Sequence, residues 1–486
     1  MIAGMLLNPS PPGRLIALVV ATVLSIATPL AADEKISGVI EAVTPAGLVV
    51  DSSTVALEEG GRLRGDVKSL PAARVGWWLE AKGRRRRGGD LLASSIRIEK
   101  EAPGVSYAER LREQSRKESG KLNASDKIFH DEEVTRYVSD LGMSLVPEYA
   151  AGMYDFSFHV IEDPSLNAFA FPNGAIYVHT GLLAKLDNEA QLAIVLGHEI
   201  SHVTQRHGQR QYKSMMSWAI PAQIGAIVVG VQVNRRTDNP VFAAMAGLGV
   251  SLGLSAAVNG YGRKLEDQAD RVGLRYMADD GYDPREAPRV WDTFTDVYGD
   301  ESRMENFFWS NHSTNDVRKS NLREEIRIHY GKESGGGEGA PADAGPSTPP
   351  AKRKIRTLEY QNVMLGVTRS NAIQDFEIER YTLAEKGFDR VLRRRPGDSV
   401  SWHYKGRIYL ETIEDEEDAR SRALAAYLKS ISLDAGYADV HRDLGLLYAE
   451  MERGADARSH LQQYLNLAPG DAGDRKEVEK AIRKIS

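Results

Sequence analysis

The N-terminal part of the chain alternates between apolar and polar residues. This two-residue period runs through Ile36–Val43, Gly47–Asp51 and Ser94–Glu99, and glycine and proline residues separate these segments. Successive side chains of a strand point to opposite faces, so the pattern predicts short, half-buried strands. We therefore predict a small β domain over residues 34–100, most simply a compact β-barrel. A docking module for substrates or partners and a plain spacer both fit this pattern.

The middle of the chain changes to a helical period. Asn188–Leu196 combines good helix formers with a buried apolar face, whereas the β-branched run Ala175–Val178 follows a Pro-Asn-Gly turn and predicts a strand. Such a strand could pair with an extended substrate or simply complete the core. Two further apolar segments, Trp218–Val233 and Val241–Val258, are too short or too weakly apolar to cross a bilayer comfortably. We predict a hairpin packed on the protein or on a membrane surface, and transmembrane passage is the alternative.

The C-terminal part shows a repeated helical pattern. Residues 331–353 are rich in glycine, proline and serine and predict a linker without a core. After it, small and aromatic residues recur at tetratricopeptide offsets. These residues are Ala384, Phe388, Pro396, Trp402, Gly406, Tyr409, His441, Leu444, Gly445, Tyr448, Ala457, Leu461, Tyr464 and Pro469. We predict a helical tetratricopeptide solenoid over residues 354–486 that binds peptides or proteins, with the acidic run Glu414–Asp418 lengthening one turn.

Composition and the N-terminal segment limit the cellular compartment and the classes of binding partner that the chain can have. With 486 residues the chain can form two or three domains, and its net charge of −6 argues against general nucleic-acid binding. Residues 1–32 resemble a secretory signal peptide, with Arg14 ahead of the apolar stretch Leu15–Leu30 and small residues after it. The chain has no cysteine, which is compatible with an oxidising compartment. We expect export to a bacterial periplasm, with a permanent membrane anchor as the alternative.

The most specific chemical signal is the H-E-x-x-H run at the end of the predicted helix. His198 and His202 are four residues apart and therefore lie on one helical face, where two neutral imidazoles can bind one zinc ion. Glu199 then takes the place of a general base. A catalytic site needs a third ligand, and Glu266 is the candidate, with Asp270 one turn later able to accept a hydrogen bond from a ligating histidine. Surface histidines and a solvated acidic helix face are the ordinary alternatives.

His207 serves as an internal comparison within the same segment. It lies nine residues after His198. On a continuous helix this separation is about 180° of rotation. We therefore expect its side chain to point away from the metal, as a solvated or structural histidine.

Four motifs in order give the chain a family resemblance. H-E-I-x-H followed by E-x-x-A-D-x-x-G resembles the HtpX/BepA-type zinc metallopeptidases, relatives of the CAAX prenyl endopeptidases. Asn167–Val178 is similar to that family's N-A-F-A-x-P-G-G-x-I-x-V run, with Asn173 in place of the first glycine. Asn311–Arg318 is similar to a T-H-P-x-x-x-x-R segment, although asparagine and serine replace the threonine and the proline. The resemblance covers about residues 105–330.

The resemblance implies an α+β fold: a mainly helical, zincin-type domain with a small sheet, between the β domain and the solenoid. It also implies one Zn²⁺ ion per chain, bound by His198, His202 and Glu266, with Glu199 as the base and Asp270 behind a ligand. His312 would gate the site or stabilise the oxyanion, or it is a polar loop residue. The residues implied in substrate binding are Asn167, Ala168, Phe169, Gly174, Ala175 and Arg318. Arg318 would hold an acidic partner or a substrate carboxylate, and a surface salt bridge is the ordinary alternative.

The resemblance further implies a role in envelope protein quality control. The expected substrates are misfolded or stalled envelope proteins, and the solenoid would recruit them or the envelope assembly proteins. Membrane-surface contact fits the apolar segments. The rival function is a chaperone-like binding protein with a latent zinc site, and a membrane-embedded peptidase is a third reading.

Overall fold

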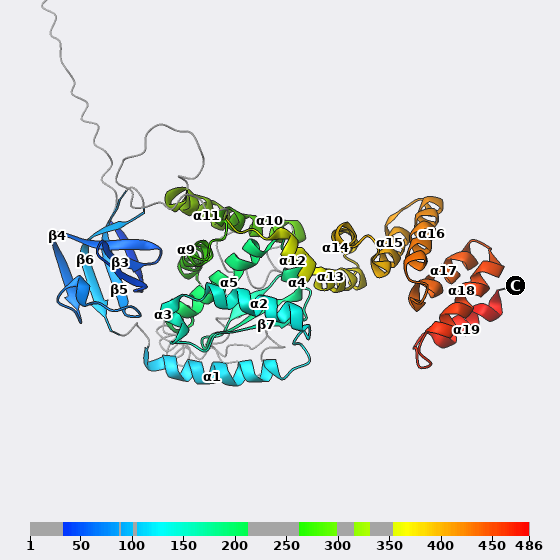
Figure 1. Cartoon of the computed structure of the whole chain (residues 1–486), viewed down its shortest axis with the longest axis horizontal. Coiled ribbons are helices and arrows are strands. Elements are labelled where there is room, and N and C mark those ends of the chain that lie inside the picture. Colours follow the sequence, from blue (N-terminus) through cyan, green and yellow to red (C-terminus); the bar gives the residue numbers. More distant parts are fainter. Residues whose placement is uncertain are drawn as a thin grey trace, which may run out of the picture.

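In the computed structural model, three parts follow one another along the long axis of the molecule (Figure 1). The structure describes residues 33–86, 89–100, 105–211, 262–298, 315–330 and 353–485. The predicted signal peptide, both apolar segments, His312 and nearly all of the predicted linker lie outside these ranges. Among the helices within them, none is both long and apolar enough to cross a bilayer.

The N-terminal part is a six-stranded sheet with the order β1-β5-β6-β4-β3-β2. Alternate residues of its strands pack into a core that includes Ile36, Val50, Leu79 and Ile98. The described strands form an open, half-barrel sheet with β1 and β2 at its edges, which agrees with the predicted small β domain and only in part with a compact barrel. The strands are β1 (Glu34–Val39), β2 (Ala42–Thr44), β3 (Gly47–Val50), β4 (Ser53–Gly65), β5 (Trp78–Arg85) and β6 (Leu91–Glu99), with a short 3-10 turn, η1 (Leu70–Ala72).

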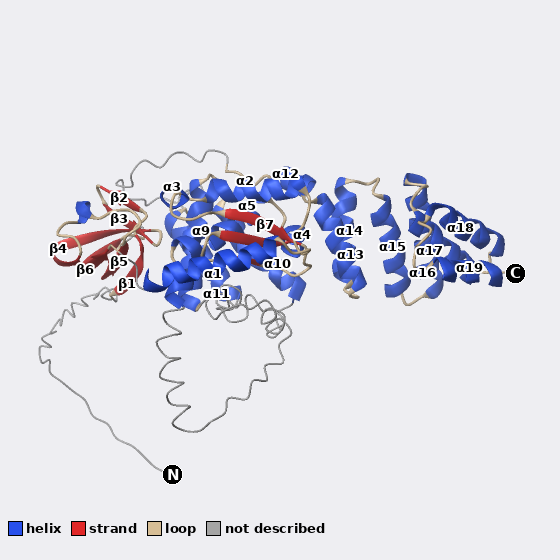
Figure 2. Cartoon of the chain, turned by 90° about the horizontal axis from the view of Figure 1, so that it is seen from below, coloured by secondary structure: helices blue, strands red, loops and turns tan. Residues whose placement is uncertain are grey.

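The middle part packs helices around a three-stranded sheet of order β7-β9-β8. Its strands are β7 (Ser157–Ile161), β8 (Ala168–Ala170) and β9 (Ala175–His179). Its helices are α1 (Val105–Asn123), α2 (Glu132–Leu145), α3 (Glu148–Ala151), α4 (Thr180–Lys185), α5 (Glu189–Thr204), α9 (Arg263–Asp279), α10 (Ala287–Tyr298) and α11 (Asn315–His329), with η2 at Pro284–Glu286. Figure 2 shows these strands enclosed among helices at the centre of the molecule.

Helix α5 lies at the centre of this part, and every one of its residues is buried. Asn188 caps its first turn by accepting a hydrogen bond from the backbone of Gln191. Helix α9 crosses α5 where Gly197 faces Gly273, and a Cβ added at Gly273 would lie 2.6 Å from the backbone nitrogen of His198. Only glycine allows this backbone-to-backbone contact, so these two residues set the distance between the helices.

The C-terminal part is a row of antiparallel helix pairs (Figure 2). Gly406 packs against the ring of Tyr427, and Gly445 against Leu461, where any larger side chain would collide. The glycines at these predicted repeat positions therefore lie where paired helices contact each other. The helices are α12 (Thr357–Val363), α13 (Leu365–Glu377), α14 (Tyr381–Arg394), α15 (Ser399–Thr412), α16 (Glu416–Leu433), α17 (Ala438–Glu450), α18 (Gly454–Leu467) and α19 (Arg475–Lys484).

The acidic run Glu414–Asp418 does not lengthen a turn, contrary to the prediction. α15 ends at Thr412 and α16 begins at Glu416, which leaves a turn as short as the one between α17 and α18. Asp415 caps α16 by accepting a hydrogen bond from the backbone of Asp418, and the acidic residues fill its first turn. Negative charge is stabilising at a helix N-terminus, so the inserted residues extend the helix instead.

The helical row begins directly on the middle part. Tyr360 donates a hydrogen bond to the carbonyl of Leu183 at 2.7 Å, and Arg390 donates to the carbonyls of Ala184 and Leu186 at 3.0 and 2.9 Å. Lys185 and the fully buried Asp375 form an ion pair at 2.5 Å. The first helices of the row are therefore fixed to α4, which leads into α5.

Replacing Gly273 by alanine should push α5 and α9 apart, because the new methyl group meets backbone atoms that cannot move aside. An overpacked core contact of this kind costs about 3 kcal/mol of unfolding free energy, measurable by urea denaturation. Gly120→Ala in α1 is the matched control, since no heavy atom lies within 4 Å of its added Cβ. That variant should gain up to about 1 kcal/mol from alanine's better helix propensity. Equal midpoints for the two variants would contradict the contact.

Candidate metal centre

Three buried side chains converge where α5 crosses α9. The Nε2 atoms of His198 and His202, one turn apart on α5, are 2.9 Å from each other. Glu266 of α9 brings its carboxylate to 3.2 Å from Nε2 of His198 and 3.6 Å from Nε2 of His202. Ligands about 2 Å from a tetrahedral zinc ion are roughly 3.3 Å apart, so this donor set fits the group.

Within the described residues, this trio is the cluster of histidine and acidic side chains that could hold a metal ion, with its donor atoms within 4.8 Å of one another. Two neutral imidazoles and one carboxylate are a donor set that zinc accepts while keeping a position open.

Asp270 and Arg318 support the ligand His198 from behind. Asp270, one turn after Glu266, places a carboxylate oxygen 2.9 Å from Nδ1 of His198. Arg318 of α11 donates to the same carboxylate at 2.7 Å and stacks over the ring of Trp291 at 4.1 Å. One nitrogen of the imidazole is thereby held by Asp270, which directs the other toward the metal position.

The pKa values of these groups reflect burial and mutual attraction. Burial opposes the charged form of His198, but Asp270 and Glu266 outweigh it and raise the pKa of His198 to about 9. Burial also opposes ionisation of Glu266, yet His202, His198 and Arg318 lower its pKa to about 2. The two carboxylates thus attract positive charge to this position, whether it is the proton on His198 or a metal cation that replaces that proton.

Glu199 points from α5 toward the strand β8. Its carboxyl group is fully buried and accepts a hydrogen bond from the backbone of Ala170, and burial raises its pKa to about 8. A carboxyl group with a pKa near neutrality is suited to taking up and releasing a proton. The strand that Glu199 faces, β8, lies at the edge of the described three-stranded sheet.

His207 lies elsewhere than the helical extrapolation placed it. α5 ends at Thr204, and Arg206 has a left-handed backbone with φ of 57°. The rotation of 100° per residue therefore stops before His207 is reached. The ring of His207 is fully buried, with Nδ1 at 2.9 Å from Nδ1 of His202 and Nε2 at 3.1 Å from Oε1 of Gln268. Burial and Arg210 hold the pKa of His207 well below its usual range.

The predicted substrate-binding residues divide into three groups. Asn167, Ala168 and Phe169 lie at and just before the edge strand β8 beside α5. The backbone carbonyls of Gly174 and Ala175 already have hydrogen-bond partners within the protein. The carbonyl of Gly174 accepts from the backbone of Ser157, and that of Ala175 accepts from the backbone of Phe171. Arg318 forms the third group by itself.

Of the two roles predicted for Arg318, holding an acidic partner or a substrate carboxylate, its contacts favour the first. It is 1% exposed and engages Asp270 and Glu266, so it supports the metal centre rather than meeting a substrate carboxylate. Sequence reasoning also missed Gln268 and Trp291, whose roles depend on how helices pack.

One family model matches the part of the chain that holds this centre. Residues 132–359 match the model of peptidase family M48, a span that contains the two histidines, both glutamates, Asp270 and Arg318. The chain contains an M48 peptidase domain. M48 peptidases depend on a metal ion, and the trio of His198, His202 and Glu266 is where this chain could bind one.

Named relatives share part of the chain. It is 33% identical over 188 residues to the beta-barrel assembly-enhancing protease of Escherichia coli K12, which is 37% of this chain and 36% of that protein. It is 32% identical over 141 residues to the mitochondrial metalloendopeptidase OMA1 of Arabidopsis thaliana, which is 29% of this chain and 26% of that protein. The chain thus covers about a third of the length of the curated relatives that it matches.

Solved structures of TPR proteins align with a smaller part of the chain. A thermophilic TPR protein of Thermus thermophilus aligns with 18% identity and a TM-score of 0.21, over 26% of this chain and 74% of that one.

Arg318→Met should strongly destabilise the metal-free protein, because it leaves two buried carboxylates without their cation. Breaking a buried pair in this way costs about 3–5 kcal/mol, which urea denaturation would measure. Arg327→Met on the same helix is the matched control, since Arg327 pairs with Glu324 at an exposed position. It should leave the midpoint unchanged, and a similar small effect at Arg318 would argue against its structural role.

Proposed function

We propose that this chain is a zinc-dependent endopeptidase of the bacterial envelope that cleaves misfolded or stalled envelope proteins. The observation that carries the proposal is the convergence of His198, His202 and Glu266 with Glu199 adjacent, inside an M48 domain. The relatives' names add support, since they are a beta-barrel assembly-enhancing protease and a metalloendopeptidase. Export by residues 1–32 and a periplasmic location belong to the same proposal.

The proposal also assigns a division of labour along the chain. Residues 105–330 would carry the chemistry, residues 354–486 would recruit unfolded substrates or envelope assembly proteins, and residues 34–100 would be a separate β domain. The helical row supports recruitment because paired helices stack into extended surfaces suited to peptides and proteins.

In the proposed mechanism, His198, His202 and Glu266 would hold one zinc ion. Zinc supplies a Lewis acid that activates water and polarises the peptide carbonyl. Glu199 takes the proton from the attacking water and returns it to the leaving amine, a transfer for which its raised pKa is suited. The edge strand β8 would align an extended substrate beside Glu199 by strand addition.

Glu199→Gln should keep the zinc content of the wild type and abolish cleavage of an unfolded protein such as casein. The amide is nearly isosteric with the carboxylate but cannot accept the proton. Cleavage by a metal-replete variant would exclude Glu199 as the base. If the wild type binds unfolded chains without cleaving them and Glu199→Gln binds equally well, the chaperone-like function replaces the peptidase.

Glu266→Ala should lower the zinc stoichiometry, measured by elemental analysis after dialysis, because it removes one of three ligands. Asp267→Ala is the matched control on the next residue, whose carboxylate contacts Asn321 rather than the metal centre. That variant should retain full zinc content. Equal zinc content in both variants would remove Glu266 from the ligand set.

A further inference from the structure

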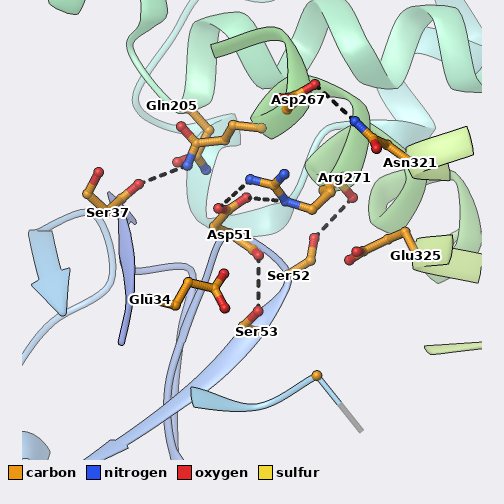
Figure 3. A network of polar contacts seen from close by, with 12 residues as sticks. Glu34, Ser37, Asp51, Ser52, Ser53, Gln205, Asp267, Arg271, Asn321 and Glu325 are labelled. Carbon is orange, nitrogen blue, oxygen red and sulfur yellow. Dashed lines mark hydrogen bonds and ion pairs between the residues drawn. The ribbon is translucent and has the colours of Figure 1, made fainter. Parts of the chain in front are cut away.

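The N-terminal sheet contacts α9, where Asp51 and Ser52 meet Arg271 (Figure 3). Arg271 forms two hydrogen bonds to Asp51, at 2.7 and 3.2 Å, and its carbonyl accepts from Ser52 at 3.0 Å. One turn later, Arg275 forms an ion pair with the buried Glu41. The helix that carries Glu266 is therefore held by the N-terminal sheet through Arg271 and Arg275.

One contact of this interface continues inward to a metal ligand. The side-chain amide of Gln268 donates to the carbonyl of Ser37 in β1 at 2.9 Å. Its oxygen lies 3.1 Å from Nε2 of His207, whose Nδ1 lies 2.9 Å from Nδ1 of His202. Gln268, His207 and His202 are all at least nineteen-twentieths buried, so water does not compete for these hydrogen bonds.

The end groups fix the direction of every hydrogen bond in this chain. The carbonyl of Ser37 can only accept, and the guanidinium of Arg210, 2.7 Å from Oε1 of Gln268, can only donate. The amide oxygen of Gln268 must therefore face His207 and accept from its Nε2–H. Nδ1 of His207 is then left as an acceptor for the Nδ1–H of His202.

The result at His202 is the tautomer that a metal ligand requires. With its proton on Nδ1, the ring presents the lone pair of Nε2 to His198 and Glu266, where the donor atoms converge. The two ligands on α5 are thus oriented by different means: a carboxylate acts on His198, and a chain of neutral groups that ends in the N-terminal sheet acts on His202.

We propose that His207 and Gln268 are positioning residues for His202, and that the N-terminal sheet, through the carbonyl of Ser37, is a structural part of the metal centre. This inference rests on the proposed zinc site. It assigns the β domain a role in holding the ligand, in place of the separate unit considered above.

Gln268→Met tests the proposal, since methionine matches the size of glutamine but can neither accept from His207 nor donate to Ser37. Zinc affinity is measured by competition with a chelator, and the ligand geometry by the visible absorption bands of the Co²⁺-substituted protein. We expect affinity to fall about 10- to 100-fold, as for other groups that orient a ligand, and the Co²⁺ bands to shift.

Gln205→Met is the matched control in the full-length chain. Gln205 is also a buried glutamine that joins the same two parts, accepting from the backbone of Val39 at 3.2 Å and reaching Glu41 at 3.4 Å, but it is no member of the chain to His202. It should keep wild-type zinc affinity and Co²⁺ bands. An equal loss in both variants would overturn the proposal, because the effect would then belong to the interface as a whole.

A second pair keeps the test valid if Gln268→Met does not fold. His207→Gln can still accept from His202 and donate to Gln268, whereas His207→Leu can do neither. We expect the glutamine variant to retain most of the affinity that the leucine variant loses, and equal affinities would overturn the proposal. A wild type that binds no zinc would refute the proposed function itself; a wild type that binds zinc with variants that match it would refute only this inference.

Discussion

Helices α5 and α9 touch backbone to backbone where Gly197 faces Gly273. The Cβ that any other residue would place at Gly273 comes within 2.6 Å of the nitrogen of His198, so the contact ties the spacing of the helices to the residue that begins the H-E-x-x-H motif. Side chains at ordinary helix separation would hold the axes farther apart. The close approach lets the short carboxylate of Glu266 reach both histidines from the neighbouring helix.

That closeness brings an electrostatic difficulty with it. Glu266 and Asp270 are buried one turn apart, and two carboxylates in so small a volume repel each other and lose their hydration. Arg318 offsets this by approaching both from α11, and the ring of Trp291 covers its other face. The guanidinium balances one carboxylate, and the charge of the other attracts a proton to His198 or a metal cation in its place.

The parts of the site that depend on local spacing could be read from the sequence. His198 and His202 share a face because four residues make about one helical turn, and Asp270 follows Glu266 for the same reason. The position of His207 could not be predicted, because the left-handed backbone at Arg206 stops the helical rotation. The partners of Arg318 and Gln268 could not be predicted either, since they lie on elements distant in sequence. The same limit applies to the N-terminal strands, whose periodicity predicts a sheet but not whether it closes.

The two flanking parts act on opposite ends of the same helix. At its beginning, the backbone of Ala190 donates to the carbonyl of Ile355, and Lys185 just before α5 pairs with Asp375 of the helical row. At its end, Gln205 bonds to β1 of the N-terminal sheet. A helix whose two ends are held by separate units keeps its histidines in place without relying on its own marginal stability. The four-residue spacing within α5 therefore sets only where the two ligands lie on the helix. Residues far from α5 in the chain set where the helix itself lies.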